Sequence, residues 1–314
     1  MVRGKRHWSQ LSESGTVVGI NILLLIYQFF GRWGFRVFLY PVISYYYWGH
    51  ATARHASKEY LQRLNSFLQQ KQHEELSSFK HFLMFGEILL DKFLVWTNKI
   101  GLDEVVFETP TVFDAMSESN KGGIIIVSHL GNMEVCSALV QQFPDLELTI
   151  LAFTQHAVKF NNMMKNASDN KRIESLQVTD MTPEVAMRLS ERINSGGYII
   201  IAGDRTPVTG ETRVSDVSFL GGLASMPQGG FILAGLLKCP TYLMFCLKQK
   251  KMYHIYLELF SHQLVFPRKE RQSGLNMVVQ QYAERLEHYC VIAPLQWFNF
   301  YSFWKEKEQV NNER

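Results

Sequence analysis

Residues Gly123–Glu134 read GIIIVSHLGNME, and this stretch decides the predicted fold. Its first half is a short run of isoleucine and valine after a glycine, which is typical of a strand buried on both faces. Ser128 and His129 follow, and the apolar spacing after them predicts a helix running to about Phe143. A strand, a polar turn and a helix in succession indicate an α/β protein.

A second stretch has the same design. Tyr198–Ala202 reads YIIIA and is followed by Gly203-Asp204-Arg205. The helix before it is predicted to begin at Thr182-Pro183-Glu184, with a capping hydroxyl and a proline at its first position. In open α/β sheets ligands bind beyond the carboxyl ends of the strands. If the two strands are parallel and near one another, His129 and the Asp204-Arg205 pair line one cleft.

The remaining pattern alternates strands with helices. We expect an α/β sandwich with a mixed, largely parallel sheet, preceded by an apolar N-terminal helical region. A break near Gln70–His73 divides the helical region before Gly101 into two helices. Further strands are predicted at Glu147–Phe153, Leu176–Val178, Pro240–Leu247 and Met252–Phe260, and further helices at Ser225–Lys238 and Gly274–Cys290.

The N-terminal region is apolar. Ser14–Gly31 carries no charge, and Val37–Ala53 lacks Asp, Glu, Lys and Arg and contains the aromatic run Tyr45–Trp48. Tyrosine and tryptophan are favoured at a membrane–water boundary. A span needs about 20 apolar residues, so the first stretch is borderline, and the second, broken by Pro41, is short. We expect membrane anchoring or in-plane insertion, and the alternative is a pair of buried core helices.

Composition excludes several classes of protein. The chain of 314 residues is 46% hydrophobic, 13% aromatic and 19% charged, which is typical of a folded protein. A net charge of +3 is too small to indicate nucleic-acid binding. The four cysteines, Cys136, Cys239, Cys246 and Cys290, show no metal-binding spacing, so free buried thiols are expected. No motif predicts a metal or cofactor.

His129 and Glu134 are the candidate catalytic pair. On a continuous helix two residues five positions apart lie roughly 140° from one another. They can meet only if His129 precedes the helix, in a turn that Gly131 makes possible. Glu134, in the first helical turn, would then hold one imidazole nitrogen and leave the other to take a proton. The alternative is a loop histidine beside an ordinary capping acid.

The motif His129–Glu134, a histidine and an acid separated by four residues that include Gly-Asn, resembles that of the lipid A biosynthesis acyltransferases. These lauroyl and myristoyl transferases of Gram-negative bacteria belong to the lysophospholipid acyltransferase superfamily. Gly203-Asp204-Arg205 resembles the family's second block. Phe219-Leu220-Gly221-Gly222, with Ala224 and Pro227, resembles the next, and Ala293–Phe298 (APLQWF) resembles the closing segment.

The resemblance implies transfer of a fatty acyl group from an acyl carrier protein or CoA thioester to a hydroxyl of a membrane lipid or glycolipid. It implies direct transfer without a cofactor, at the bacterial inner membrane with the catalytic domain facing the cytoplasm. Residues 1–100 would be membrane-associating and amphipathic helices, and residues 101–314 the acyltransferase domain, in one structural unit. His129 would be the general base and Glu134 its orienting acid. The implied substrate-binding residues are Asn132, Asp204, Arg205, Phe219, Gly221, Gln296 and Trp297.

The chain also departs from that family. Leu295 stands where an acid normally precedes the glutamine, and the arginines that normally come directly after the tryptophan are absent, with Phe298–Trp304 (FNFYSFW) in that region. The acceptor therefore stays open between lipid A, a phospholipid and another lipid such as an aryl polyene or flexirubin-type product. Two other functions remain as alternatives, a lipid ester or thioester hydrolase using the same pair and a catalytically silent relative. The basic residues Lys159, Lys165, Lys171 and Arg172 could dock an acidic carrier or form a solvated helix face.

Overall fold

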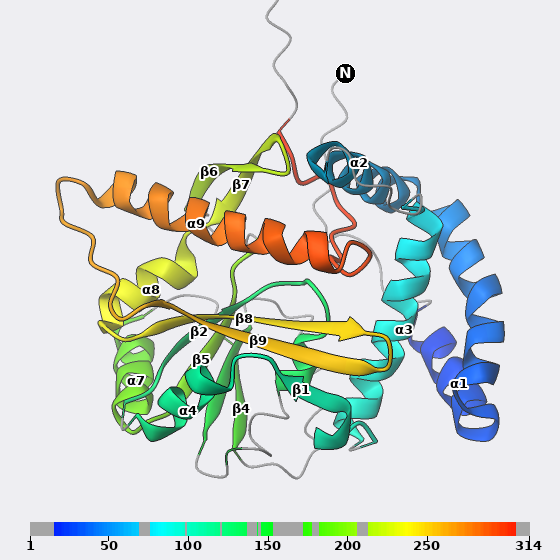
Figure 1. The fold of residues 1–314 in the computed structure, drawn as a ribbon, viewed down its shortest axis with the longest axis horizontal. Helices are drawn as coiled ribbons and strands as arrows, with labels where there is room; N and C mark the ends of the chain where they lie inside the picture. The colour runs from blue at the N-terminus through cyan, green and yellow to red at the C-terminus, as the bar shows by residue number, and fades with distance from the viewer. Residues whose placement is uncertain are drawn as a thin grey trace, which may run out of the picture.

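The computed structural model describes residues 16–68, 76–97, 99–119, 121–136, 143, 146–152, 172–177, 182–205 and 213–305. They contain a seven-stranded sheet in the order β1-β9-β8-β2-β5-β3-β4 (Figure 1). Neighbouring strands are parallel except β8 and β9, which confirms the expected mixed, largely parallel sheet. The strands are β1 (Val105–Phe107), β2 (Gly123–Val127), β3 (Leu148–Ala152), β4 (Ile173–Gln177), β5 (Tyr198–Ala202), β8 (Thr241–Gln249) and β9 (Met252–Ser261).

Helices cover both faces of the sheet, as expected of an α/β sandwich. Strand β2 has no exposed face, because Ile124 and Ile126 enter one apolar cluster and Ile125 and Val127 enter the other. The helices of the first cluster are α2 (Ala51–Leu68), α7 (Pro183–Asn194), α8 (Gly229–Leu237) and α9 (Arg271–Ile292), and those of the second are α1 (Thr16–Gly49), α3 (Ser78–Trp96) and α4 (Pro110–Glu118).

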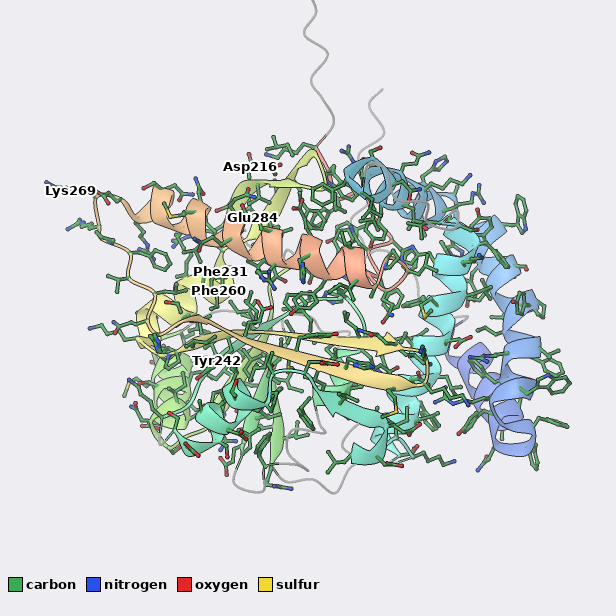
Figure 2. All side chains as sticks on the ribbon, viewed as in Figure 1. Asp216, Phe231, Tyr242, Phe260, Lys269 and Glu284 are labelled. Carbon is green, nitrogen blue, oxygen red and sulfur yellow. The ribbon has the colours of Figure 1, made fainter. Side chains whose placement is uncertain are left out.

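Side-chain packing fixes the long helices on the sheet. Figure 1 shows α9 lying across the sheet, with α8 beside its first turns. Phe231 of α8 meets Phe260 of β9, with ring centroids 6.1 Å apart, and both are labelled in Figure 2. Phe231 also contacts the ring of Tyr282 on α9, 5.6 Å away. Aromatic contacts therefore hold α8 and α9 against one another and against the sheet.

Several local predictions are confirmed. Strands β2 and β5 have the predicted bounds. Helix α7 begins after Thr182, whose hydroxyl accepts a hydrogen bond from the Val185 N–H at 3.4 Å. The region before Gly101 forms the two expected helices, α2 and α3, although Gln70–His73 itself lies outside the described residues.

One predicted helix is wrong in part. Ser225–Lys238 does not begin as a helix, because Gly222–Pro227 forms strand β7, paired antiparallel with β6 (Val214–Phe219). Leu220 and Gly221 connect the strands with positive φ angles of 48° and 69°. A two-residue turn with positive φ angles fits the twist of a β-hairpin. The apolar spacing of Ser225–Lys238, from which the helix was predicted, does not reveal this turn.

Helix α1 lies at the margin of the molecule beside α3 (Figure 1). Its backbone leaves the helical region at Gly31 (φ 65°), and Phe35, Leu39 and Ile43 are buried at every fourth position. Large apolar side chains on its other sides are exposed, so the alternative of two buried core helices does not hold for residues 25–49. The exposed set is Leu25, Phe29, Phe30, Trp33, Val37, Phe38, Tyr40, Tyr45 and Trp48.

Figure 2 shows side chains of α1 projecting outward, away from the rest of the molecule. In the part of the chain that the structure describes, no helix has both the length and the apolar character needed to cross a bilayer. We refer to the exposed side chains at Phe29, Phe30, Trp33, Tyr45 and Trp48 as the α1 aromatic face.

Candidate active site

The site lies where two adjacent strands end. Strands β2 and β5 are parallel neighbours, and Val127 pairs with Ala202 at their last position. The Gly203 N–H donates to the Val127 carbonyl at 2.8 Å, which continues the pairing by one residue. His129 and Asp204 consequently leave the sheet at the same level. The condition for a shared cleft, parallel strands near one another, is confirmed.

His129 is fixed by Asp204. Its Nδ1 lies 2.7 Å from Asp204 Oδ1, and its backbone N–H donates to Oδ2 at 2.8 Å. The indole N–H of Trp297 donates to the same Oδ2 at 3.1 Å. The Asp204 side chain is only 1% exposed, whereas that of His129 is 26% exposed. An ionised carboxylate accepts a proton-bearing Nδ1, so Nε2 is the ring nitrogen that can take a proton from a substrate.

Electrostatics keep the pair in a useful protonation state. The pKa of His129 is lowered, mainly by burial and then by the positive charge of Arg205, with a smaller effect of Lys92 in the same direction. The negative charge of Asp204 raises this pKa, but not enough to reverse the shift. Burial raises the pKa of Asp204, but His129 and Arg205 together bring it below its ordinary value. At neutral pH the imidazole is therefore neutral and the carboxylate ionised, as a general base and its orienting group require.

The contact that was predicted for Glu134 is made by another acid. Among the described residues, the carboxylate that holds the imidazole belongs to Asp204. Glu134 does follow His129 in the first turn of a short helix, η3 (Met133–Cys136), as expected. Its side chain lies 3.8 Å from Lys92 Nζ on α3. The short distance in sequence placed the acid near the site, but β5 brings a better-placed carboxylate from 75 residues away.

Gly131 makes the turn after His129 possible. Its φ is +75°, and a Cβ there would lie 1.9 Å from the Cys246 carbonyl oxygen. Asn132 is fully buried, its N–H donates to that carbonyl at 2.9 Å, and its Oδ1 accepts the Glu134 N–H at 3.2 Å. Its Nδ2 donates to the Tyr253 hydroxyl at 3.4 Å. Asn132 therefore shapes the turn, and its contact with substrate stays a prediction.

The closing segment Ala293–Phe298 packs against the turn after β2. The Gln296 side chain pairs with both the N–H and the carbonyl of Lys248, at 2.9 and 2.7 Å. The Gln296 carbonyl accepts the Gly131 N–H at 2.9 Å, and the His129 carbonyl accepts the Phe298 N–H at 3.1 Å. Arg205 donates to the Phe298 carbonyl at 2.8 Å. The predicted residues Arg205, Gln296 and Trp297 are thus brought to His129, but Gln296 supports the backbone.

Two further residues predicted to bind substrate, Phe219 and Gly221, belong to the β6–β7 hairpin. The Phe219 ring has no exposed area and packs 5.1 Å from the ring of Trp297. Gly221 is the exposed turn residue of the β6–β7 hairpin. Phe219 therefore supports Trp297 from behind, and Gly221 serves the hairpin.

Other residues at the site were not predicted. Asp91 and Lys92 of α3 lie near the turn at residues 129–134, and the Tyr282 hydroxyl of α9 donates to the Val127 carbonyl at 3.2 Å. The first two carried a signal in the sequence, since they are adjacent charges in the otherwise apolar segment Ile88–Val95. Tyr282 carried none beyond helical spacing.

The described residues contain no group of three or more metal-ligating side chains. Cys239, Cys246 and Cys290 are buried free thiols, as expected, whereas the side chain of Cys136 lies outside the described part. Lys159, Lys165 and Lys171 also lie outside it, so a carrier-docking surface there stays a prediction. Comparison with known protein families finds no match, and comparison with curated proteins finds no relative.

Proposed function

We propose that the protein is an O-acyltransferase that moves a fatty acyl group from a carrier-protein or CoA thioester to the hydroxyl of a membrane lipid or glycolipid. The observation that carries this proposal is the hydrogen bond between His129 Nδ1 and Asp204 Oδ1, at the adjoining ends of β2 and β5. It supplies a neutral, oriented imidazole at the edge of the sheet where α/β proteins bind ligands. The resemblance of the surrounding motifs to lipid A acyltransferases selects acyl transfer.

The proposed reaction needs one base. His129 Nε2 removes the proton from the acceptor hydroxyl as its oxygen attacks the thioester carbonyl carbon. The tetrahedral intermediate then collapses, the carbon–sulfur bond breaks, and the thiolate leaves. The imidazolium returns the proton to the sulfur, which gives an ester and a thiol. Asp204 stabilises the imidazolium between these steps.

Arg205 and Lys92 supply positive charge to this reaction. Both lower the pKa of His129, so both charges act at the imidazole. Arg205 also lies over the Tyr301 ring, with its guanidinium carbon 5.8 Å from the ring centroid. We propose that Arg205 binds a phosphate of the donor or the negative charge that develops on the thioester oxygen.

The α1 aromatic face supports a location at a lipid surface. Trp33 and Trp48 are 76% and 74% exposed, and aromatic side chains of this kind prefer the headgroup level of a bilayer. We propose that α1 lies in the plane of the bacterial inner membrane, with the catalytic domain on the cytoplasmic side. The acceptor lipid would then reach the site from the membrane.

The activity is tested with purified protein, a long-chain acyl thioester and vesicles of bacterial lipid. The expected products are free thiol and a lipid heavier by one acyl group, detected by mass spectrometry. His129→Ala is expected to reduce the rate by about 10²–10⁴-fold, the usual contribution of a general base. His254→Ala is the control, because that histidine pairs with Glu108 away from the site. Free fatty acid in place of the ester would indicate a hydrolase, and an unchanged rate in His129→Ala would exclude the mechanism.

Lipid binding is tested separately by sedimentation with the same vesicles. Replacing Trp33 and Trp48 with serine is expected to weaken binding at least about tenfold, since each large apolar side chain contributes on the order of 1.5–3 kcal/mol on burial. Met277→Ser is the control, because Met277 is a large apolar side chain that is 64% exposed on α9, outside the α1 aromatic face. Equal losses in both proteins would contradict a specific role for α1.

A further inference from the structure

A buried carboxylate joins α1 to the catalytic turn. Asp91 of α3 has no exposed surface, yet three donors from three elements hold it. Arg32 Nη1 of α1 lies 2.7 Å from its Oδ1. Lys248 Nζ of β8 and the Tyr253 hydroxyl of β9 lie 2.6 and 2.7 Å from its Oδ2.

Two chains of hydrogen bonds lead from Asp91 to the turn that carries His129. Through Tyr253, the first reaches the Asn132 side chain, whose Oδ1 in turn holds the Glu134 N–H. Through the backbone of Lys248, the second reaches the Gln296 side chain, and the Gln296 carbonyl accepts the Gly131 N–H. Both chains end between residues 131 and 134.

The stability of the fold alone does not explain why Asp91 is buried among three donors. A buried charge is costly, and a buried ion pair is often no more stabilising than an apolar pair of the same shape. What the cluster does provide is a fixed geometry, because each donor can satisfy Asp91 only from one position. Arg32 is 39% exposed, so the cluster also reaches the surface through α1.

We propose that Asp91 is a positioning residue for the catalytic turn, and that the position of α1, through Arg32, determines how firmly that turn is held. This inference rests on the proposed function for its kinetic consequence only. The structural consequence is independent of it. Loosening the cluster should release the backbone of residues 131–134 whether or not acyl transfer is the reaction.

Tyr253→Phe removes the hydroxyl between Asp91 and Asn132 and keeps the ring. Its matched control is Tyr256→Phe on the same strand, whose hydroxyl accepts from Gln249 instead. Hydrogen exchange of the Gly131, Asn132 and Glu134 amides is expected to accelerate about fivefold or more in Tyr253→Phe, as for the loss of one hydrogen bond, and to stay unchanged in the control. Equal exchange in the two variants would overturn the proposal.

The part played by α1 is tested with Arg32→Gln against Arg36→Gln. Arg36 is the neighbouring arginine on α1, and its bidentate bond goes to Glu87, which lies 3.8 Å from Lys248 Nζ, not to Asp91. Arg32→Gln is expected to accelerate exchange at residues 131–134, and Arg36→Gln, which leaves the donors of Asp91 in place, to accelerate it less. If Arg32→Gln does not fold, Arg32→Lys, which keeps the charge, serves in its place, with a smaller acceleration expected. No acceleration in a folded Arg32 variant would overturn the link to α1.

Kinetics separate a positioning role from a general loss of structure. With an acyl thioester and lipid vesicles, Tyr253→Phe is expected to lower kcat about fivefold and to change KM for the thioester less than twofold. If the parent protein shows no acyl transfer but the exchange results hold, the proposed function fails and the positioning role stands. If the parent is active and neither exchange nor kcat responds to Tyr253→Phe, only the positioning role fails.

Discussion

The turn after β5 and the turn after β2 each present one carboxylate to the site, and they hold it very differently. Asp204 is buried and accepts three hydrogen bonds, two of them from His129. Glu134 stands closer in sequence to the histidine, but its side chain lies 3.8 Å from Lys92. The comparison teaches that a neighbour across parallel strands is better placed to orient a side chain than a neighbour along a helical turn.

The largest expected effect separates the two carboxylates directly. Asp204→Asn keeps the shape of the side chain but removes the charge that stabilises the imidazolium, so kcat should fall by about 10²–10⁴-fold. Glu134→Gln should lower it less than about tenfold, because the carboxylate at the imidazole belongs to Asp204, while Glu134 lies 3.8 Å from Lys92. Steady-state rates of thiol release measure both.

The reverse order of effects would show that the acid of the motif is the orienting group after all. Circular dichroism of both variants provides the control for folding. Asp204 is the more buried residue, so its variant needs this check most.

A smaller effect tests the third bond to Asp204. Trp297→Phe removes the indole N–H that donates to Oδ2 and keeps an aromatic ring beside Phe219, so kcat should fall about five- to tenfold. Trp304→Phe is the matched control, because its indole N–H donates to the Phe219 carbonyl at 2.8 Å, away from the carboxylate. The two variants should lose similar thermal stability. Similar losses of kcat would argue against a role for the bond.

The smallest effect is a shift in pH dependence. The base acts when neutral, so kcat/KM should rise with pH through the pKa of His129, which lies below its usual 6.5. Arg205 lowers that pKa by its charge. In Arg205→Gln the pKa should therefore rise, and the acid limb of the profile should move to higher pH. A limb that stays in place, or moves to lower pH, would contradict the charge effect.

Much of the fold followed from local pattern. The runs Gly123–Val127 and Tyr198–Ala202 are short, β-branched and bounded by glycines, and they became β2 and β5 with the predicted bounds. Their pairing was conditional in the sequence and is confirmed in the sheet. The position of His129 before a turn at Gly131 was predicted on the assumption that His129 meets Glu134, and the turn is present although Asp204 makes the contact.

The rest depended on contacts that local pattern does not encode. The choice of Asp204 over Glu134 is decided by strand order, which brings β5 beside β2. The β6–β7 hairpin was mistaken in part for a helix, since Ser225–Pro227 is apolar enough to suit either. The exposure of much of α1 could not be read from composition, because its buried and its exposed positions both carry large apolar side chains.

The pairing of Val127 with Ala202 has a consequence for how such proteins can diverge. The distance between His129 and Asp204 is determined by the paired ends of β2 and β5. It does not depend on the number of residues between them in the chain, which is 74. Insertions or deletions in that interval can accumulate without moving the two side chains, since loop length costs little. Relatives should therefore be sought by a pair of short fingerprints, GIIIVSHLGN and YIIIAGDR, with free spacing between them.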